Sequence, residues 1–274
     1  MLDLHLHTLY SDGELTPLEL IRLLKSKGVT TFSITDHDCI LGLNEGKKIA
    51  EEHNLNFIIG SEFEAYYDIE NESYVHILGY NFSDTTEIDA YLTQLRKERL
   101  ELIDRYIKLL NSTGIQVSFE EINALTPGIH LTSSHIAAII QNKGYTRTFD
   151  EAKEKFLIPS SKYYIPRRYN TTEFVISLIN KAGGVAILAH PCRIKMTKEE
   201  IEKFILRLKT YGLKGIEAIY LNSSQEEKEF FISLARKHKL FITAGSDWHS
   251  YSDDCGPGVN LSENIEYEIL TNLQ

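Results

Sequence analysis

Two histidines near the start of the chain are spaced so that they can share a metal ion. His5 and His7 lie two residues apart in the segment DLHLHTLYSDG. Successive side chains of a β-strand point to opposite faces, so these imidazoles are expected on one side of a strand end. The turn SDG that follows can fold the carboxylate of Asp12 back over them. Taken alone, one such pair is explained more simply by a solvated strand end.

Histidines and carboxylates recur where further strands are predicted to end. The complete set has six imidazoles and three carboxylates: His5, His7, Asp12, His37, Glu62, His76, His190, Asp247 and His249. A packed core does not tolerate so many unpaired ionisable groups, and bound metals remove the difficulty. At three to four ligands per ion, the set suits two or three cations better than one.

The elements that must position these residues alternate between strands and helices. Short apolar or β-branched segments predict about seven strands, among them TTFSIT, NFIIG, SYVHILGY, GVAILAHP, GIEAIY and FITAGSDWH. Capped segments with helical periodicity separate most of them, at residues 16–28, 42–53, 171–181, 198–211 and 225–237, with a short helix at 265–270. This alternation indicates a parallel α/β architecture. A (β/α) barrel gathers its strand ends at one mouth, so we favour it over an open sheet.

A helical insertion interrupts the alternation. Residues 85–164 contain no apolar β-run, and their apolar residues recur with helical periods. We therefore expect residues 1–84 and 165–274 to form the barrel. Residues 85–164 are expected to form an insertion that covers its mouth.

Composition narrows the classes of function. The chain has 274 residues, 42% hydrophobic and 25% charged, which is typical of a soluble globular protein. Its formal net charge of -10 argues against a long nucleic-acid footprint. Nothing resembles a membrane span or a secretory signal, so we expect a cytoplasmic protein. The cysteines Cys39, Cys192 and Cys255 are far apart and predict neither disulfides nor a thiolate metal site.

Six motifs, in their order and spacing, resemble the signature of the polymerase and histidinol phosphatase (PHP) family. They are HLHTLYSDG, ITDHD, GSE, VHILGY, AHP and GSDWH. Within that family they are similar to the small phosphoesterases that hydrolyse nucleotide phosphates. The resemblance implies a distorted (β/α)7 barrel with three divalent metal ions. Imidazole and carboxylate ligands without thiolate suit manganese, iron or zinc, and magnesium is also compatible.

The resemblance also assigns ligands. It implies a first ion held by His5, His7, Glu62 and Asp247. Glu62 would bridge to a second ion that His76 and His190 also hold, and Asp12, His37 and His249 would hold the third. Three divalent ions outweigh three carboxylates, so the pocket would attract a phosphate dianion. A hydroxide bridging the metals would then attack a small phosphomonoester, most simply a mononucleotide or a 3′,5′-bisphosphate.

Two further residues are predicted to contact phosphate. Arg193 occupies the place of an HP-x-R arginine in these relatives and can clamp phosphate through two hydrogen bonds. His135 resembles a phosphate-contacting histidine of the insertion, where relatives usually have an arginine two positions earlier. That position is Ser133 here, so Arg147, Arg167 or Arg168 would have to compensate.

Other functions are also compatible with the sequence. Within the family, the alternatives are a histidinol-phosphate phosphatase and an exonuclease for short oligonucleotides. An amidohydrolase-type enzyme also opens with His-x-His, but it leaves Asp12, His37 and Glu62 without roles. A non-catalytic nucleic-acid-binding accessory module is disfavoured because none of the nine predicted ligands is missing. Elemental analysis of bound metal separates the phosphoesterase from the amidohydrolase.

Overall fold

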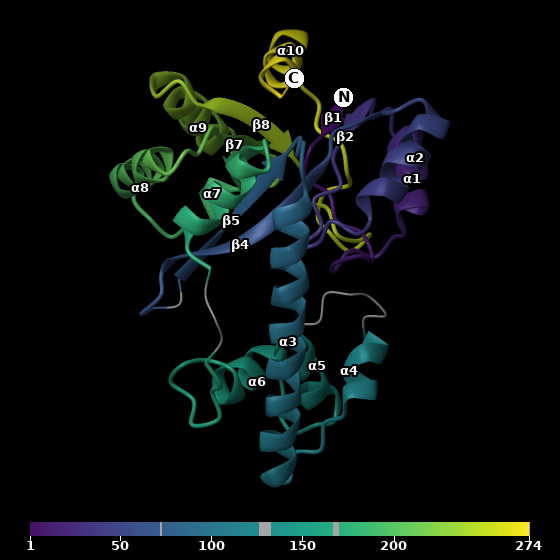
Figure 1. Ribbon diagram of the computed structural model, residues 1–274, viewed down its shortest axis with the longest axis vertical. Coiled ribbons are helices and arrows are strands. Elements are labelled where there is room, and N and C mark those ends of the chain that lie inside the picture. The colour runs from purple at the N-terminus through teal and green to yellow at the C-terminus, as the bar shows by residue number, and fades with distance from the viewer. Residues whose placement is uncertain (72, 126–132, 167–169, 274) are drawn as a thin grey trace. The chain divides into compact units, whose positions relative to one another are not determined.

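The chain forms two compact units, and the eight strands of its described part all belong to the first unit. The computed structural model describes residues 1–274 apart from 72, 126–132, 167–169 and 274 (Figure 1). The first unit comprises Met1–Asp89 and Tyr169–Gln274, and the second comprises Ala90–Arg168. These boundaries lie four to five residues beyond those expected from the sequence. The covering role expected of the second unit stays a prediction.

The strands of the first unit form two sheets. Three short strands, β1 (Leu2–Asp3), β2 (Thr31–Phe32) and β3 (Asn56–Phe57), pair in parallel in that order. Five strands make the larger sheet: β4 (Gly60–Asp68), β5 (Ser73–Tyr80), β6 (Val185–Leu188), β7 (Gly215–Tyr220) and β8 (Phe241–Gly245), again in sequence order.

Backbone bonds connect the two sheets. The N–H of Leu4 donates to the carbonyl of Ala244 at 3.1 Å, and isolated bridges join Leu6 to Trp248 and His37 to Glu62. Strand ends from both sheets therefore lie next to one another. The predicted α/β class is confirmed.

One strand runs against the predicted direction. β5 is antiparallel to both β4 and β6, whereas β6, β7 and β8 pair in parallel. Parallel neighbours need a long crossover, but the four residues between β4 and β5 allow only a hairpin. The expectation of an entirely parallel sheet is therefore wrong at β5. Because the strand is reversed, His76 reaches the site from its first half.

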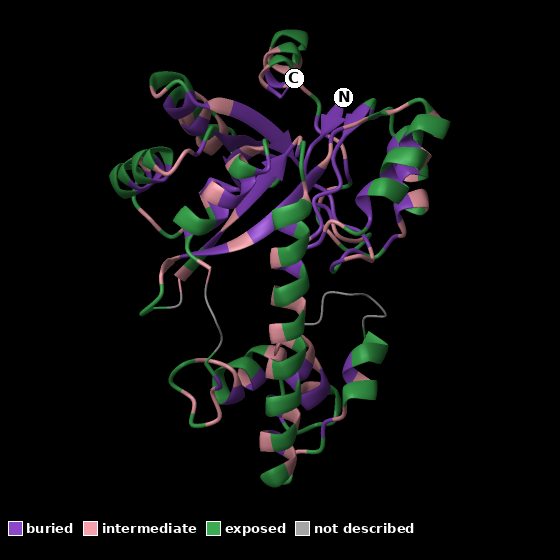
Figure 2. Cartoon of the chain, in the orientation of Figure 1, coloured by how far each residue is buried: buried purple, intermediate pink, exposed green. Residues whose placement is uncertain are grey.

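The helices of the first unit are α1 (Pro17–Ser26), α2 (Leu43–His53), α7 (Thr172–Lys181), α8 (Lys198–Thr210), α9 (Gln225–Lys237) and α10 (Glu263–Asn272), with a 3-10 turn η1 at Pro191–Arg193. Side-chain caps begin four of these helices, α1, α7, α8 and α9. In α1, Thr16 and Glu19 form a capping box, and Leu20, Ile21 and Leu24 are buried on one face. Figure 2 shows this pattern, with buried strands and half-exposed helices.

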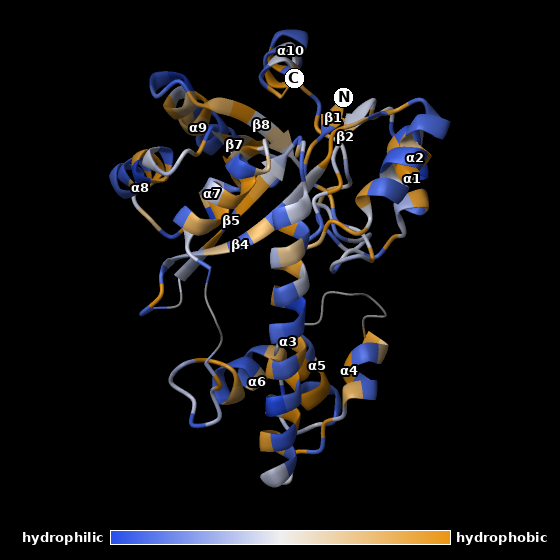
Figure 3. Ribbon diagram, viewed as in Figure 1, coloured by the Kyte–Doolittle hydropathy of each residue, from blue (hydrophilic) through white to orange (hydrophobic). Residues whose placement is uncertain are grey.

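The first unit buries an apolar core beneath α1. This core contains Leu6, Phe32 and Ile34 together with the helix residues, and it includes Trp248. In Figure 3 the ribbons of this unit's helices alternate between hydrophobic and hydrophilic residues along their length. The packing of Leu6 in this core fixes the segment after β1 that carries His5 and His7.

The second unit is helical and has a core of its own. Its helices are α3 (Thr86–Ser112), which begins in the first unit, α4 (Phe119–Leu125), α5 (Ser133–Asn142) and α6 (Phe149–Phe156). Ile103, Tyr106, Leu110, Ile136 and Ile140 are among the buried residues that pack together. A capping box precedes α4, with Ser118 and Glu121 bonded to each other's backbone N–H groups.

Candidate metal centre

Glu62 lies at the centre of five imidazoles. Its fully buried carboxylate follows the start of β4. Three imidazole nitrogens lie 3.1–3.3 Å from Oε2, and they belong to His5, His7 and His37. Two more approach Oε1, from His76 at 2.8 Å and from His190 at 3.0 Å. The two oxygens of one carboxylate thus face two different sets of nitrogen donors, as a carboxylate that bridges two cations would.

Asp247 adds a second carboxylate to the cluster, next to His5 and His7. Its Oδ1 lies 3.3 Å from Nε2 of His5 and 3.2 Å from Nε2 of His7. The ligand atoms of His5, His7, Glu62 and Asp247 all lie within 4.8 Å of one another. This group has the composition expected for the first ion.

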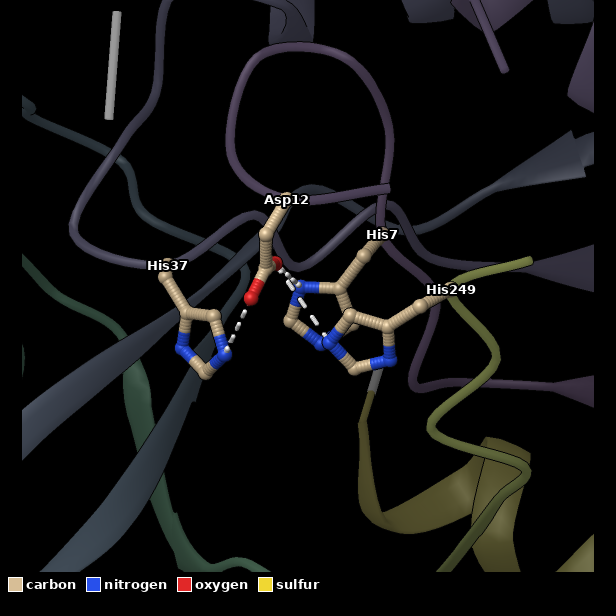
Figure 4. A group of neighbouring side chains, drawn as sticks. All are labelled: His7, Asp12, His37 and His249. Atoms are coloured by element: carbon tan, nitrogen blue, oxygen red, sulfur yellow. Dashed lines mark ion pairs between the residues drawn. The ribbon is translucent and has the colours of Figure 1, made fainter. Parts of the chain in front are cut away.

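A second group surrounds Asp12 (Figure 4). The carboxylate of Asp12 lies 3.7 Å from Nδ1 of His7, 3.9 Å from Nε2 of His37 and 3.4 Å from Nε2 of His249. The rings of His7 and His249 are stacked, with centroids 4.0 Å apart. This group contains the three residues expected around the third ion, Asp12, His37 and His249, and also His7. Asp12 is the most exposed member, with 43% of its side chain accessible.

The group around the second predicted ion differs from the expected one. His37, Glu62 and His76 place their ligand atoms within 4.8 Å of one another. His190 does not belong to any of the three such groups found among the described residues, although it lies close to Glu62. His37 thus approaches both the Asp12 group and the Glu62 group. The division of ligands among individual ions stays a prediction.

Three buried atoms fit a bound cation. Nε2 of His5, Nε2 of His7 and Oε2 of Glu62 are buried and make no hydrogen bond within the described part of the chain. Leaving such atoms unsatisfied costs about 1–3 kcal/mol each, and more for a charged group. They face one another, and nitrogen and oxygen donors of this kind bind divalent transition metals. The residues present therefore fit the metals that the sequence predicts.

Mutual attraction shifts the pKa values of the cluster. Burial alone would raise the pKa of Glu62, but His5, His76 and His37 hold it well below its usual range. Burial alone would lower the pKa of His7, but the nearby carboxylates of Asp247 and Glu62 raise it to about 10. Burial dominates at His37 and lowers its pKa to about 3. In the metal-free protein, protons on some imidazoles balance the buried carboxylates.

The backbone is strained at two of these residues. His190, two residues after the end of β6, has a φ of 25°, and Asp247, two residues after the end of β8, has a φ of 58°. Non-glycine residues rarely adopt positive φ, and such strain clusters at functional sites. Backbone bonds hold both: the N–H of Asp247 donates to the carbonyl of His5, and the N–H of His190 donates to Glu217.

Sequence reasoning missed three buried carboxylates that orient the cluster. Glu217 on β7 accepts hydrogen bonds from Nδ1 of His5 at 3.0 Å and from the N–H of His190 at 2.7 Å. The signal for Glu217 was a single carboxylate within the apolar segment GIEAIY.

Asp36 and Asp3 act on the backbone that carries the histidines. Asp36 accepts bonds from Thr8 and Ser11 and so fixes the loop that carries Asp12. Asp3 accepts bonds from the N–H groups of His5, Ser246 and Gly258 and from the hydroxyl of Ser246. Through Ser246, Asp3 connects the first strand to the segment that precedes Asp247.

Arg193 reaches the cluster. Its Nη1 lies 2.9 Å from Oδ2 of Asp247, and 58% of its side chain is exposed. It can therefore present its remaining donors to an anion at the edge of the cluster.

The structure does not place the other predicted phosphate contacts in the cluster. His135 lies half-buried on α5 of the second unit, Arg147 lies at the start of the α6 region, and Arg167 and Arg168 lie outside the described residues. Their phosphate contacts stay predictions. Trp248 is 2% exposed and packs in the core.

The fold and cluster together define an α/β protein of the metal-dependent hydrolase class, and comparison with known proteins identifies its family. A model of the PHP domain matches residues 3–211. The 5′-3′ exoribonuclease of Haemophilus influenzae is 29% identical over 96% of this chain and 94% of its own length. The 3′,5′-nucleoside bisphosphate phosphatase of Chromobacterium violaceum is 30% identical over 96% of this chain and 92% of its own. The chain belongs to the PHP domain family.

A solved structure agrees with this assignment. A candidate metal-dependent phosphoesterase from Bifidobacterium adolescentis superimposes with a TM-score of 0.79 at 29% identity, covering 99% of this chain and 96% of that one.

Among the described residues, no helix combines the length and the apolar character needed to span a membrane.

Proposed function

We propose that this protein is a metal-dependent phosphoesterase that hydrolyses the phosphate ester of a nucleotide, either a mononucleotide or a 3′,5′-bisphosphate. The observation that carries the proposal is Glu62, whose two oxygens face five imidazoles at 2.8–3.3 Å. The names of the phosphatase and the phosphoesterase among its relatives support the same chemistry.

The ligand sets are part of the proposal. His5, His7, Glu62 and Asp247 would hold one ion, and His76 and His190 would join Glu62 at a second. Asp12, His37 and His249 would hold a third. When bound, divalent manganese, iron or zinc would supply positive charge to a phosphate and lower the pKa of water towards about 7.

The chain's own residues orient and retain the substrate. Arg193 would hold a phosphate oxygen through the donors that Asp247 leaves free. Glu217 fixes the ring of His5 so that Nε2 faces Glu62 and Asp247. Because these groups are held before substrate binds, little reorganisation is needed during the reaction.

A second candidate is the removal of nucleotides from a short oligonucleotide. The relative from Haemophilus influenzae named a 5′-3′ exoribonuclease favours it. It would use the same cluster, because a phosphodiester and a phosphomonoester both present negatively charged non-bridging oxygens that cations can hold. The net charge of -10 favours a short substrate over a long one.

A phosphate-release assay tests the proposal. The metal-stripped protein is reloaded separately with manganese, iron, zinc or magnesium. It is then offered nucleoside monophosphates, 3′,5′-bisphosphates, sugar phosphates, histidinol phosphate and 5′-phosphorylated dinucleotides. We expect turnover of nucleotides that depends on metal. Hydrolysis of histidinol phosphate alone would overturn the substrate class, and no hydrolysis with any metal would overturn the chemistry.

A further inference from the structure

Tyr74 is an exposed aromatic residue beside the candidate metal centre. It lies on β5 two residues before His76, so both side chains leave the same face of the strand. Tyr74 is 50% exposed, whereas most large apolar residues of the same sheet are buried. Its partner across the antiparallel ladder is Tyr66 on β4, which is 3% exposed.

Two rings contact that of Tyr74. The ring of Tyr74 stacks on that of His76, with centroids 5.6 Å apart and planes inclined by 28°. The ring of Tyr66 lies 5.6 Å from that of Tyr74 and is tilted by 46°. Tyr74 is thus held by two neighbours, so it offers a fixed surface to solvent at little cost in side-chain entropy.

Ring contacts connect Tyr74 to the cluster. The ring of His76, on which Tyr74 stacks, also lies 5.2 Å from the ring of His190, measured between centroids. Arg193 follows His190 by three residues and contacts Asp247 in the cluster. Tyr74 therefore stacks directly on a member of the cluster at which the phosphate would lie.

We propose that Tyr74 is the platform on which the base of a nucleotide stacks while its phosphate lies at the metal centre. The inference rests on the function proposed above and adds a residue that distinguishes nucleotides from sugar phosphates. Every base has a π-face, so the platform would select for a base without selecting which one. Stacking on one aromatic residue corresponds to roughly 5- to 150-fold in affinity.

Three variants and two substrates test the platform. Tyr74→Leu removes the aromatic face but keeps an apolar side chain, Tyr74→Phe keeps the face, and Tyr267→Leu alters an exposed tyrosine on α10 as a matched control. Each is assayed on adenosine 5′-phosphate and on ribose 5-phosphate, and bound metal is measured in parallel. We expect Tyr74→Leu to raise the KM for the nucleotide about tenfold, with the KM for ribose 5-phosphate and the metal content unchanged. Tyr74→Phe and Tyr267→Leu are expected to match the unaltered protein.

The outcomes separate this inference from the function on which it rests. Equal losses on both substrates, together with lost metal, would mean that Tyr74 only supports His76, and would overturn the platform. So would a nucleotide KM that Tyr74→Leu leaves unchanged. A fourth variant, Tyr251→Leu, tests another position for the base, beside His249, where Tyr251 packs on Trp248. A KM that changes in this variant and not in Tyr74→Leu would also overturn the platform. If the unaltered protein hydrolyses neither substrate with any metal, the proposed function fails first.

Discussion

Glu217 holds the ring of His5 through a hydrogen bond of 3.0 Å between Oε1 and Nδ1. Its second oxygen accepts the backbone N–H of His190 at 2.7 Å. One buried carboxylate thus orients a candidate ligand that follows the first strand and the strained backbone of another that follows β6. Carboxylates that orient metal-bound histidines are nearly as important to such sites as the ligands themselves.

The Glu217→Gln variant should therefore retain metal poorly. The amide oxygen can accept only one of the two bonds in this geometry, because the amide nitrogen is a donor and faces another donor. We expect metal affinity and turnover to fall roughly 10- to 100-fold. Elemental analysis and phosphate release measure both. Glu226→Gln, at an exposed position on α9, serves as the control and should leave both unchanged. Equal behaviour of the two variants would show that Glu217 has no orienting role.

Asp247→Asn should abolish turnover and reduce bound metal. The substitution keeps the size of the side chain but removes a charge that lies 3.2–3.3 Å from Nε2 of His5 and His7. It also weakens the contact with Arg193. Asp104→Asn, at an exposed position of α3, is the control and should behave as the unaltered protein. Full activity of Asp247→Asn with unchanged metal content would refute its proposed role as a ligand.

Arg193→Ala should raise the KM for the nucleotide more than it lowers kcat. A hydrogen bond to a charged group contributes about 1.5–3 kcal/mol, so a rise of roughly 10- to 150-fold is expected. Arg193→Lys should recover part of this, because it keeps the charge but loses the planar fork. Steady-state kinetics with saturating metal provide the measurement. If kcat and bound metal fall together while KM stays constant, Arg193 instead serves to hold Asp247.

The elements of the fold could be predicted where local signals decide them. Thr16 with Glu19 and Ser118 with Glu121 mark helix starts through bonds within one turn, and both capping boxes are present. The direction of β5 follows instead from the length of its connection to β4, which a strand count ignores. The α/β class was therefore predictable, whereas one strand's direction was not inferred.

The candidate site was predictable to the extent that its residues end strands. His5, His7 and Asp247 come directly from such ends, and the structure brings them together. Glu217 was missed because its role depends on two partners that are distant in sequence, 212 and 27 residues away.

Metal uptake should release protons and weaken as the pH falls. In the metal-free protein, burial lowers the pKa of His7, but Asp247 and Glu62 raise it further, to about 10. At pH 7.5 this imidazole therefore carries a proton, and a metal binds only the neutral ring. For each proton that the metal displaces, its affinity falls about tenfold with every pH unit below that pKa. Calorimetric titration of the stripped protein with manganese, in two buffers of different ionisation enthalpy, measures the release. We expect at least one proton from the unaltered protein and fewer from His7→Gln, whereas a binding heat that is the same in both buffers would contradict the charge assigned to His7.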